Sequence, residues 1–91
     1  MSQLTHYRKD GIEFTKDDGG RIILAVHSGR EIKLGQKVHS NGRFMVPDGV
    51  LGIVVCIHEP GEKGLTSNIF DVWFEGALNT TLMKTKDLRI V

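Results

Sequence analysis

The chain has 91 residues, of which 40% are hydrophobic and 25% charged, and its formal net charge is +1. This size allows one domain with a small core, and the composition is that of a globular protein rather than a disordered chain. The near-neutral total argues against the strongly basic surface on which sequence-independent nucleic-acid binding depends, and it leaves room for a local basic patch.

Cysteine content and hydropathy predict the compartment. The single cysteine, Cys56, allows no intramolecular disulfide, which is typical of intracellular proteins. No apolar run approaches the roughly 18–20 residues of a membrane span, and residues 1–6 lack the apolar centre of a signal peptide. We therefore expect a cytoplasmic protein without a membrane segment.

Turn residues divide the chain into short β-strands. Residues 1–10 are polar and predict a loosely ordered N-terminus, followed by a single domain over residues 11–91. The alternation at residues 12–14, the Asp- and Gly-rich turn at 16–20 and the apolar run 21–27 predict a β-hairpin over residues 11–27. A turn followed by a strand is expected within residues 32–38. Further strands are expected at residues 50–58, 69–75, 80–84 and 89–91, with one helical turn at 85–88.

The run at residues 49–57 is the most apolar and β-branched segment of the chain. Its apolar residues fall on both strand parities, whereas a strand with one solvated face alternates apolar with polar residues. The strand is therefore covered on both sides, or it bends and changes the parity that faces inward. Glycine within a strand marks a bulge or a tight bend, so we expect the bend at Gly52. No segment has a helical apolar period, and the prediction is an all-β fold: a small barrel of about five strands with an N-terminal β-hairpin extension.

The pattern from residue 34 to residue 91 resembles the SH3-like small-barrel superfamily. The matching features are Gly35-x-x-Val38, Gly49-x-x-Gly52-x-Val54-x-x-Ile57, Val72-Trp73-Phe74 and the closing run Lys86-Asp87-Leu88-Arg89-Ile90-Val91. The layout is similar to KOW and Tudor-like barrels and to a family of small barrel-shaped accessory proteins of photosystem I. The resemblance implies a barrel that binds proteins, peptides or RNA, or a docking component of an electron-transfer complex.

Four residues are candidates for contact with a protein partner. Arg43, Phe44 and Met45 precede the apolar run 49–57 in a loop that borders the binding face of SH3-like barrels, and an exposed aromatic beside Arg is typical of an interface anchor. The alternative is that Phe44 folds back into the core. Trp73 lies on the parity opposite Phe70, Val72 and Phe74, so it points outward if those three fill the barrel. Either the extension, through Ile23 or Ala25, or a partner then covers it.

A second set of candidates is basic. Lys84, Lys86 and Arg89 are close in sequence, with Lys37 expected nearby. Such a cluster is either a solvated face or a patch that contacts phosphates.

Histidine and cysteine residues do not form a recognisable reactive motif. His6, His27, His39, His58 and Cys56 lack the spacing of zinc sites, and Cys56 stands in an apolar run that does not favour a thiolate. We expect no enzyme activity, no metal and no cofactor. The predicted function is a small non-enzymatic binding module, an adaptor or accessory subunit that docks onto a protein partner. The alternative is a KOW-like protein that binds RNA or DNA through the basic patch. Apolar residues on both parities at residues 21–27 and 50–58 exceed what a minimal barrel can bury, which also suggests a homodimer through the extension.

Overall fold

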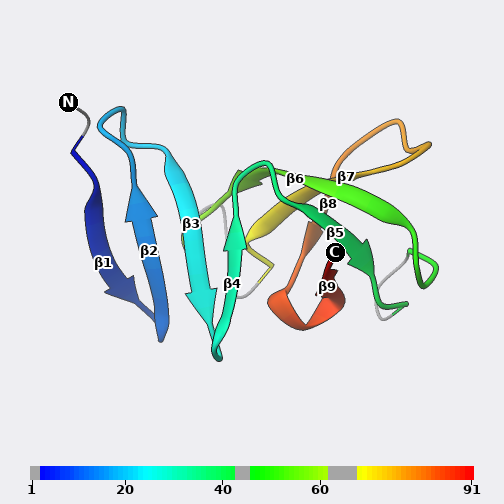
Figure 1. Cartoon of the computed structure of the whole chain (residues 1–91), viewed down its shortest axis with the longest axis horizontal. Coiled ribbons are helices and arrows are strands. Elements are labelled where there is room, and N and C mark those ends of the chain that lie inside the picture. Colours follow the sequence, from blue (N-terminus) through cyan, green and yellow to red (C-terminus); the bar gives the residue numbers. More distant parts are fainter. Residues whose placement is uncertain (1–2, 43–45, 62–67) are drawn as a thin grey trace.

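The chain folds into two antiparallel sheets in a computed structural model, which describes residues 3–42, 46–61 and 68–91. The first sheet has the strand order β1-β2-β3-β4, and the second has the order β8-β7-β6-β5-β9. The strands are β1 (Thr5–Lys9), β2 (Ile12–Lys16), β3 (Ile22–His27), β4 (Arg30–Lys33), β5 (Lys37–Ser40), β6 (Leu51–Ile57), β7 (Phe70–Phe74), β8 (Thr81–Met83) and β9 (Leu88–Ile90), with the 3-10 helix η2 (Thr85–Asp87) before β9. The two sheets lie at opposite ends of the long axis of the molecule (Figure 1). Within the described ranges, no helix has the length and hydropathy needed to cross a bilayer.

The N-terminal extension is larger than the predicted hairpin. Residues 5–9, expected to be loosely ordered, form β1 and pair with β2, and β4 adds a fourth strand beside β3. Both added strands are joined by two-residue turns, Asp10-Gly11 and Ser28-Gly29, in which both residues have positive φ. That backbone matches the twist of a β-hairpin, which explains why each turn returns the chain directly into a paired strand.

The predicted hairpin over residues 11–27 is confirmed in the centre of this sheet. β2 and β3 pair antiparallel, and the Asp17 carboxylate accepts hydrogen bonds from the N–H groups of Gly19 at 3.0 Å and Arg21 at 2.9 Å. An aspartate that bonds the backbone of its own turn is a common way to fix a tight loop.

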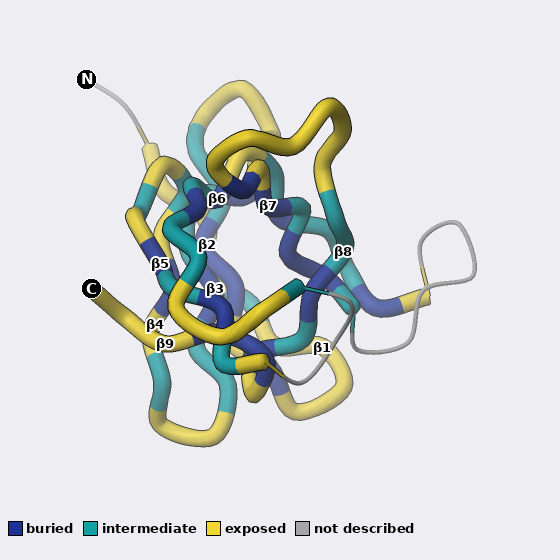
Figure 2. The backbone as a smooth tube through the Cα atoms, turned by 90° about the vertical axis from the view of Figure 1, so that its right-hand side faces the viewer, coloured by how far each residue is buried: buried dark blue, intermediate teal, exposed yellow. Residues whose placement is uncertain are grey.

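The second sheet curls into a half-barrel, in agreement with the predicted small barrel of about five strands. Its last strand, β9, returns to pair with its first strand, β5, and the sheet winds around a centre lined by buried residues (Figure 2). Phe70, Val72 and Phe74 of β7 point into this centre and are buried, as their alternation predicted.

In β6, the set of alternate residues that faces inward changes at a β-bulge. The bend was expected at Gly52, and that position was wrong. The pairing of β6 with β7 shifts register between Val54 and Cys56, so Val54 faces inward before the bulge and Ile57 after it. Gly52 has a different role. A Cβ atom there would lie 2.8 Å from side-chain carbons of both Val72 and Phe74, so this glycine permits close packing rather than a bend.

One core joins the two sheets. Buried side chains of the first sheet, such as Phe14, Ala25 and Ile32, belong to the same cluster as Val54 and Val72 of the second. Packing between the sheets accounts for part of the apolar surplus in β3 and β6, because Ala25 and Val54 are buried in this shared core.

Candidate functional site

The structure places the predicted partner-binding residues only in part. Arg43, Phe44 and Met45 lie outside the described residues. Trp73 is described, and it lies on the outer face of the five-stranded sheet with 39% of its surface exposed.

A cross-strand row on this outer face runs through three strands. Lys37 of β5 pairs with Ile53 of β6, and Ile53 pairs with Trp73 of β7. Directly paired residues of an antiparallel sheet project from the same face with Cβ atoms about 5 Å apart. The row therefore places an aliphatic and an aromatic side chain beside a cation, all outside the barrel.

The turn after β7 extends this surface. The indole Nε1 of Trp73 donates a hydrogen bond of 3.1 Å to the carbonyl oxygen of Ala77. The next residue, Leu78, is 97% exposed. The hydrogen bond fixes the turn against the indole ring, and the side chain of Leu78 extends into solvent beside it. We call Ile53, Trp73 and Leu78 together the Trp73 surface.

Charges of opposite sign border the Trp73 surface. Asp71 of β7 precedes Trp73 by two residues on the same face, and Glu75 follows Trp73 by two residues, directly after the strand ends. On the other side, Lys37 and His39 project from β5, and His39 pairs with Arg89 of β9. The apolar centre therefore lies between the carboxylates of Asp71 and Glu75 on one side and the cations of Lys37 and Arg89 on the other, with Arg89 paired to Asp48.

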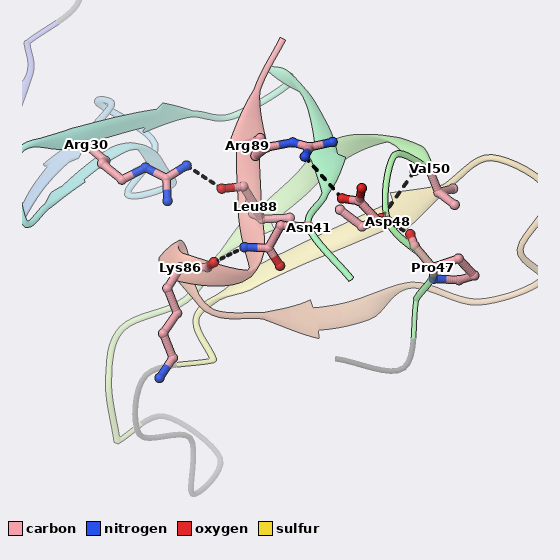
Figure 3. A network of polar contacts seen from close by, with 9 residues as sticks. Arg30, Asn41, Pro47, Asp48, Val50, Lys86, Leu88 and Arg89 are labelled. Carbon is pink, nitrogen blue, oxygen red and sulfur yellow. Dashed lines mark hydrogen bonds and ion pairs between the residues drawn. The ribbon is translucent and has the colours of Figure 1, made fainter. Parts of the chain in front are cut away.

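The structure separates the four predicted basic residues. Arg89 forms an ion pair of 3.1 Å with Asp48 (Figure 3). Lys37 lies beside the Trp73 surface, in the cross-strand row with Ile53 and Trp73. Lys84 and Lys86 instead line a cavity of about 260 Å³ beside η2.

Residues of the first sheet complete the wall of this cavity. Of these, only His27 was considered from the sequence, as a metal ligand, and it was not retained as a site residue. The lining residues are His27, Ser28, Arg30, Lys84, Thr85 and Lys86. His27 Nδ1 and the hydroxyl of Thr85 form a hydrogen bond of 3.2 Å. Arg30 donates to the carbonyl oxygen of Thr85 at 2.8 Å. It also donates to the carbonyl oxygen of Leu88 (Figure 3). These contacts span more than fifty positions of the chain, so no local sequence signal predicts them.

Cys56 and His58 both lie near Asp71. Cys56 pairs with Asp71 across the β6–β7 ladder, and His58 Nε2 lies 3.9 Å from the Asp71 carboxylate. In the described parts of the chain, no three His, Cys, Asp or Glu side chains are grouped so that they could hold a metal ion.

Glu59 joins the segment after β6 to the first sheet. Its carboxylate lies 3.3 Å from the ammonium groups of both Lys9 and Lys16. Burial raises the pKa of Glu59, but hydrogen bonds with Lys16, Lys9 and Tyr7 outweigh it, so the pKa lies below the ordinary value of 4.5.

Comparison with known proteins adds no family assignment: no family model, no curated protein and no solved structure matches this chain.

Proposed function

We propose that this chain is a non-enzymatic binding module with an SH3-like barrel, and that it docks onto a protein partner through the Trp73 surface. The strand order β8-β7-β6-β5-β9, with η2 placed directly before β9, supports the SH3-like assignment. It is the layout that the resemblance over residues 34–91 implies. Such a module would act as an adaptor or accessory subunit in the cytoplasm.

The observation that carries the proposal is the exposure of Trp73 next to Leu78. Large apolar side chains grouped at a surface mark interaction sites more often than isolated ones do, and tryptophan is strongly enriched among the residues that dominate binding energy. The core already has aromatic side chains in Phe14, Phe70 and Phe74, so the position of Trp73 outside it favours a role in recognition.

The bordering charges favour a protein over a membrane or a polyanion as the occupant. The acidic side chains of Asp71 and Glu75 lie on the same face as the basic ones of Lys37 and Arg89. A surface with both signs around an apolar centre sets the orientation of a complementary protein, whereas the acidic strand would repel phosphate groups.

Affinity capture from an extract of the native cells tests this function when the bait is varied at Leu78. Wild-type protein and the Leu78→Asp variant are compared, with Leu4→Asp as the matched control. Leu4 is also an exposed leucine (50%), but it precedes β1 at the opposite end of the molecule. Because Leu78 is almost fully exposed, its substitution should change stability by less than about 0.5 kcal/mol.

We expect a protein that wild type and Leu4→Asp retain and that Leu78→Asp loses, with the difference unaffected by nuclease. Equal capture by all three baits, or capture that nuclease abolishes, would contradict docking through this surface.

The KOW-like alternative rests on Lys84 and Lys86, which the structure brings together with Arg30 at one cavity. Nucleic-acid binding there would weaken steeply with salt, because phosphate contacts release counterions. Titration of single-stranded and duplex oligonucleotides at two salt concentrations checks it, and binding that is absent or insensitive to salt would discard this function.

A further inference from the structure

We propose that the cavity between the β3–β4 turn and η2 is a binding site for the phosphoryl group of a small phosphate monoester. The site lies away from the Trp73 surface and does not depend on docking there. Its volume of about 260 Å³ is several times that of a water molecule, about 30 Å³, and below the usual range of drug-sized ligand pockets. A phosphate group with a small substituent such as a pentose matches this size.

The positive charges of Arg30, Lys84 and Lys86 at the cavity have no carboxylate ion-pair partner among the described residues. Five basic side chains elsewhere have carboxylate partners within 4 Å: Arg8, Lys9, Lys16, Lys33 and Arg89. The carboxylate of Asp87 is buried and accepts a hydrogen bond of 3.2 Å from the backbone N–H of Lys84. Three cations in one concave site create a field that attracts an anion.

The backbone of η2, on one side of the cavity, is held by hydrogen bonds within the chain. Arg30 holds η2 against the first sheet through the carbonyl groups of Thr85 and Leu88. Asn41 donates a hydrogen bond to the carbonyl oxygen of Lys86, whose side chain extends away from these contacts (Figure 3). Arg30 is therefore a positioning residue that adds charge, and the lysine ammonium groups are the direct ligands. A backbone held in this way lowers the ordering cost of binding.

A phosphate monoester fits this donor set better than a carboxylate does. It carries a charge of about −1.5 to −2 at pH 7 and three acceptor oxygens, which match two ammonium groups and the charge of Arg30. Lysine binds phosphate as a point charge without a fixed bidentate geometry. A second cavity, of about 490 Å³, lies on the outer face of the first sheet. It has no excess of positive charge, because its Arg8 is paired with Glu13 at 3.3 Å.

Titration followed by NMR of the backbone amides tests the site. The probes are inorganic phosphate, ribose 5-phosphate and, as the uncharged control, ribose. The protein forms are wild type, the double variant Lys84→Gln/Lys86→Gln, and the control Lys37→Gln. The control removes one positive charge beside the Trp73 surface and none at the cavity. Thermal unfolding of each variant checks that the fold is retained.

We expect both phosphate probes, and not ribose, to shift the amide signals of Ser28, Gly29 and Lys86. The double variant should weaken binding by about tenfold or more, which corresponds to about 1.4 kcal/mol, and Lys37→Gln should leave it unchanged. Tighter binding of ribose 5-phosphate than of phosphate supports the monoester. Equal or tighter binding of inorganic phosphate identifies free phosphate as the source and overturns the monoester assignment. No shift at these amides, an equal shift with ribose, or unchanged binding in a folded double variant would overturn the site itself.

Discussion

Gly52 shows how a single residue limits the packing of the barrel. It is a strand residue without a positive φ, and its importance comes from the lack of a side chain where β6 crosses Val72 and Phe74. A methyl group at 2.8 Å from both side chains forces them to move in a packed core.

Gly52→Ala should therefore destabilise the protein by about 1–3 kcal/mol, measured by chemical denaturation. Gly19→Ala is the matched control, because Gly19 lies in an exposed turn without positive φ, and a Cβ there would meet only Asp17 Oδ1, at 3.4 Å. A loss of stability at Gly19 as large as at Gly52 would contradict this account of the core.

Glu59 predicts a pH dependence with a defined sign. Because its pKa in the folded chain lies below the ordinary 4.5, its ionised form is favoured by folding. Its contribution is present above the unfolded pKa and is lost as the pH falls through the folded pKa.

Glu59→Gln should be less stable than wild type at pH 7 by at most about 1 kcal/mol, since the ion pairs with Lys9 and Lys16 are solvent-accessible. The difference should shrink as the pH is lowered from 7 to about 3. Denaturation curves of both proteins at the two pH values measure it, and a difference that grows in acid would be the wrong sign.

Among the elements, the strands of the barrel were predictable and the first sheet was predicted only in part. The apolar alternation at Phe70, Val72 and Phe74 and the β-branched run 50–58 predicted β7 and β6 correctly. β1 was missed because its sequence is polar and mostly exposed, so it carries no apolar pattern. The turn Asp10-Gly11 was a usable signal, since an Asp-Gly pair in a two-residue loop favours a paired strand on both sides.

The junction between the sheets could not be predicted from the sequence. Arg30 and Thr85 are 55 positions apart, and local propensity carries no information on such a contact. The candidate cavity is therefore a product of tertiary structure, whereas the outward position of Trp73 followed from strand parity alone.

Arg30→Met should destabilise the protein by about 2–3 kcal/mol, because two charged hydrogen bonds to backbone carbonyls are lost and these bonds are partly buried. Arg21→Met is the control: Arg21 is exposed in the β2–β3 turn, and its substitution should stay within about 0.5 kcal/mol. Chemical denaturation compares them, and equal effects would contradict the role of Arg30 as a link between the sheets.

For the whole molecule, two sheets around one core produce two separate surfaces. The Trp73 surface lies on the outer face of the barrel, and the basic cavity lies where the barrel meets the first sheet. The shared core also accounts for part of the apolar surplus that suggested a homodimer, because Ala25 and Val54 are buried within one chain. Among the described residues, the exposed large apolar side chains include Trp73, Leu78 and those at the chain end, Ile90 and Val91.

The fluorescence of Trp73, the single tryptophan of the chain, tests the proposed docking through the Trp73 surface most directly. In the isolated protein the emission should be red-shifted and readily quenched by acrylamide, and in the complex with the captured partner it should shift to the blue and become protected. A blue, protected emission in the isolated protein, or an emission that the partner leaves unchanged, would contradict the proposal that this protein acts by docking through Trp73.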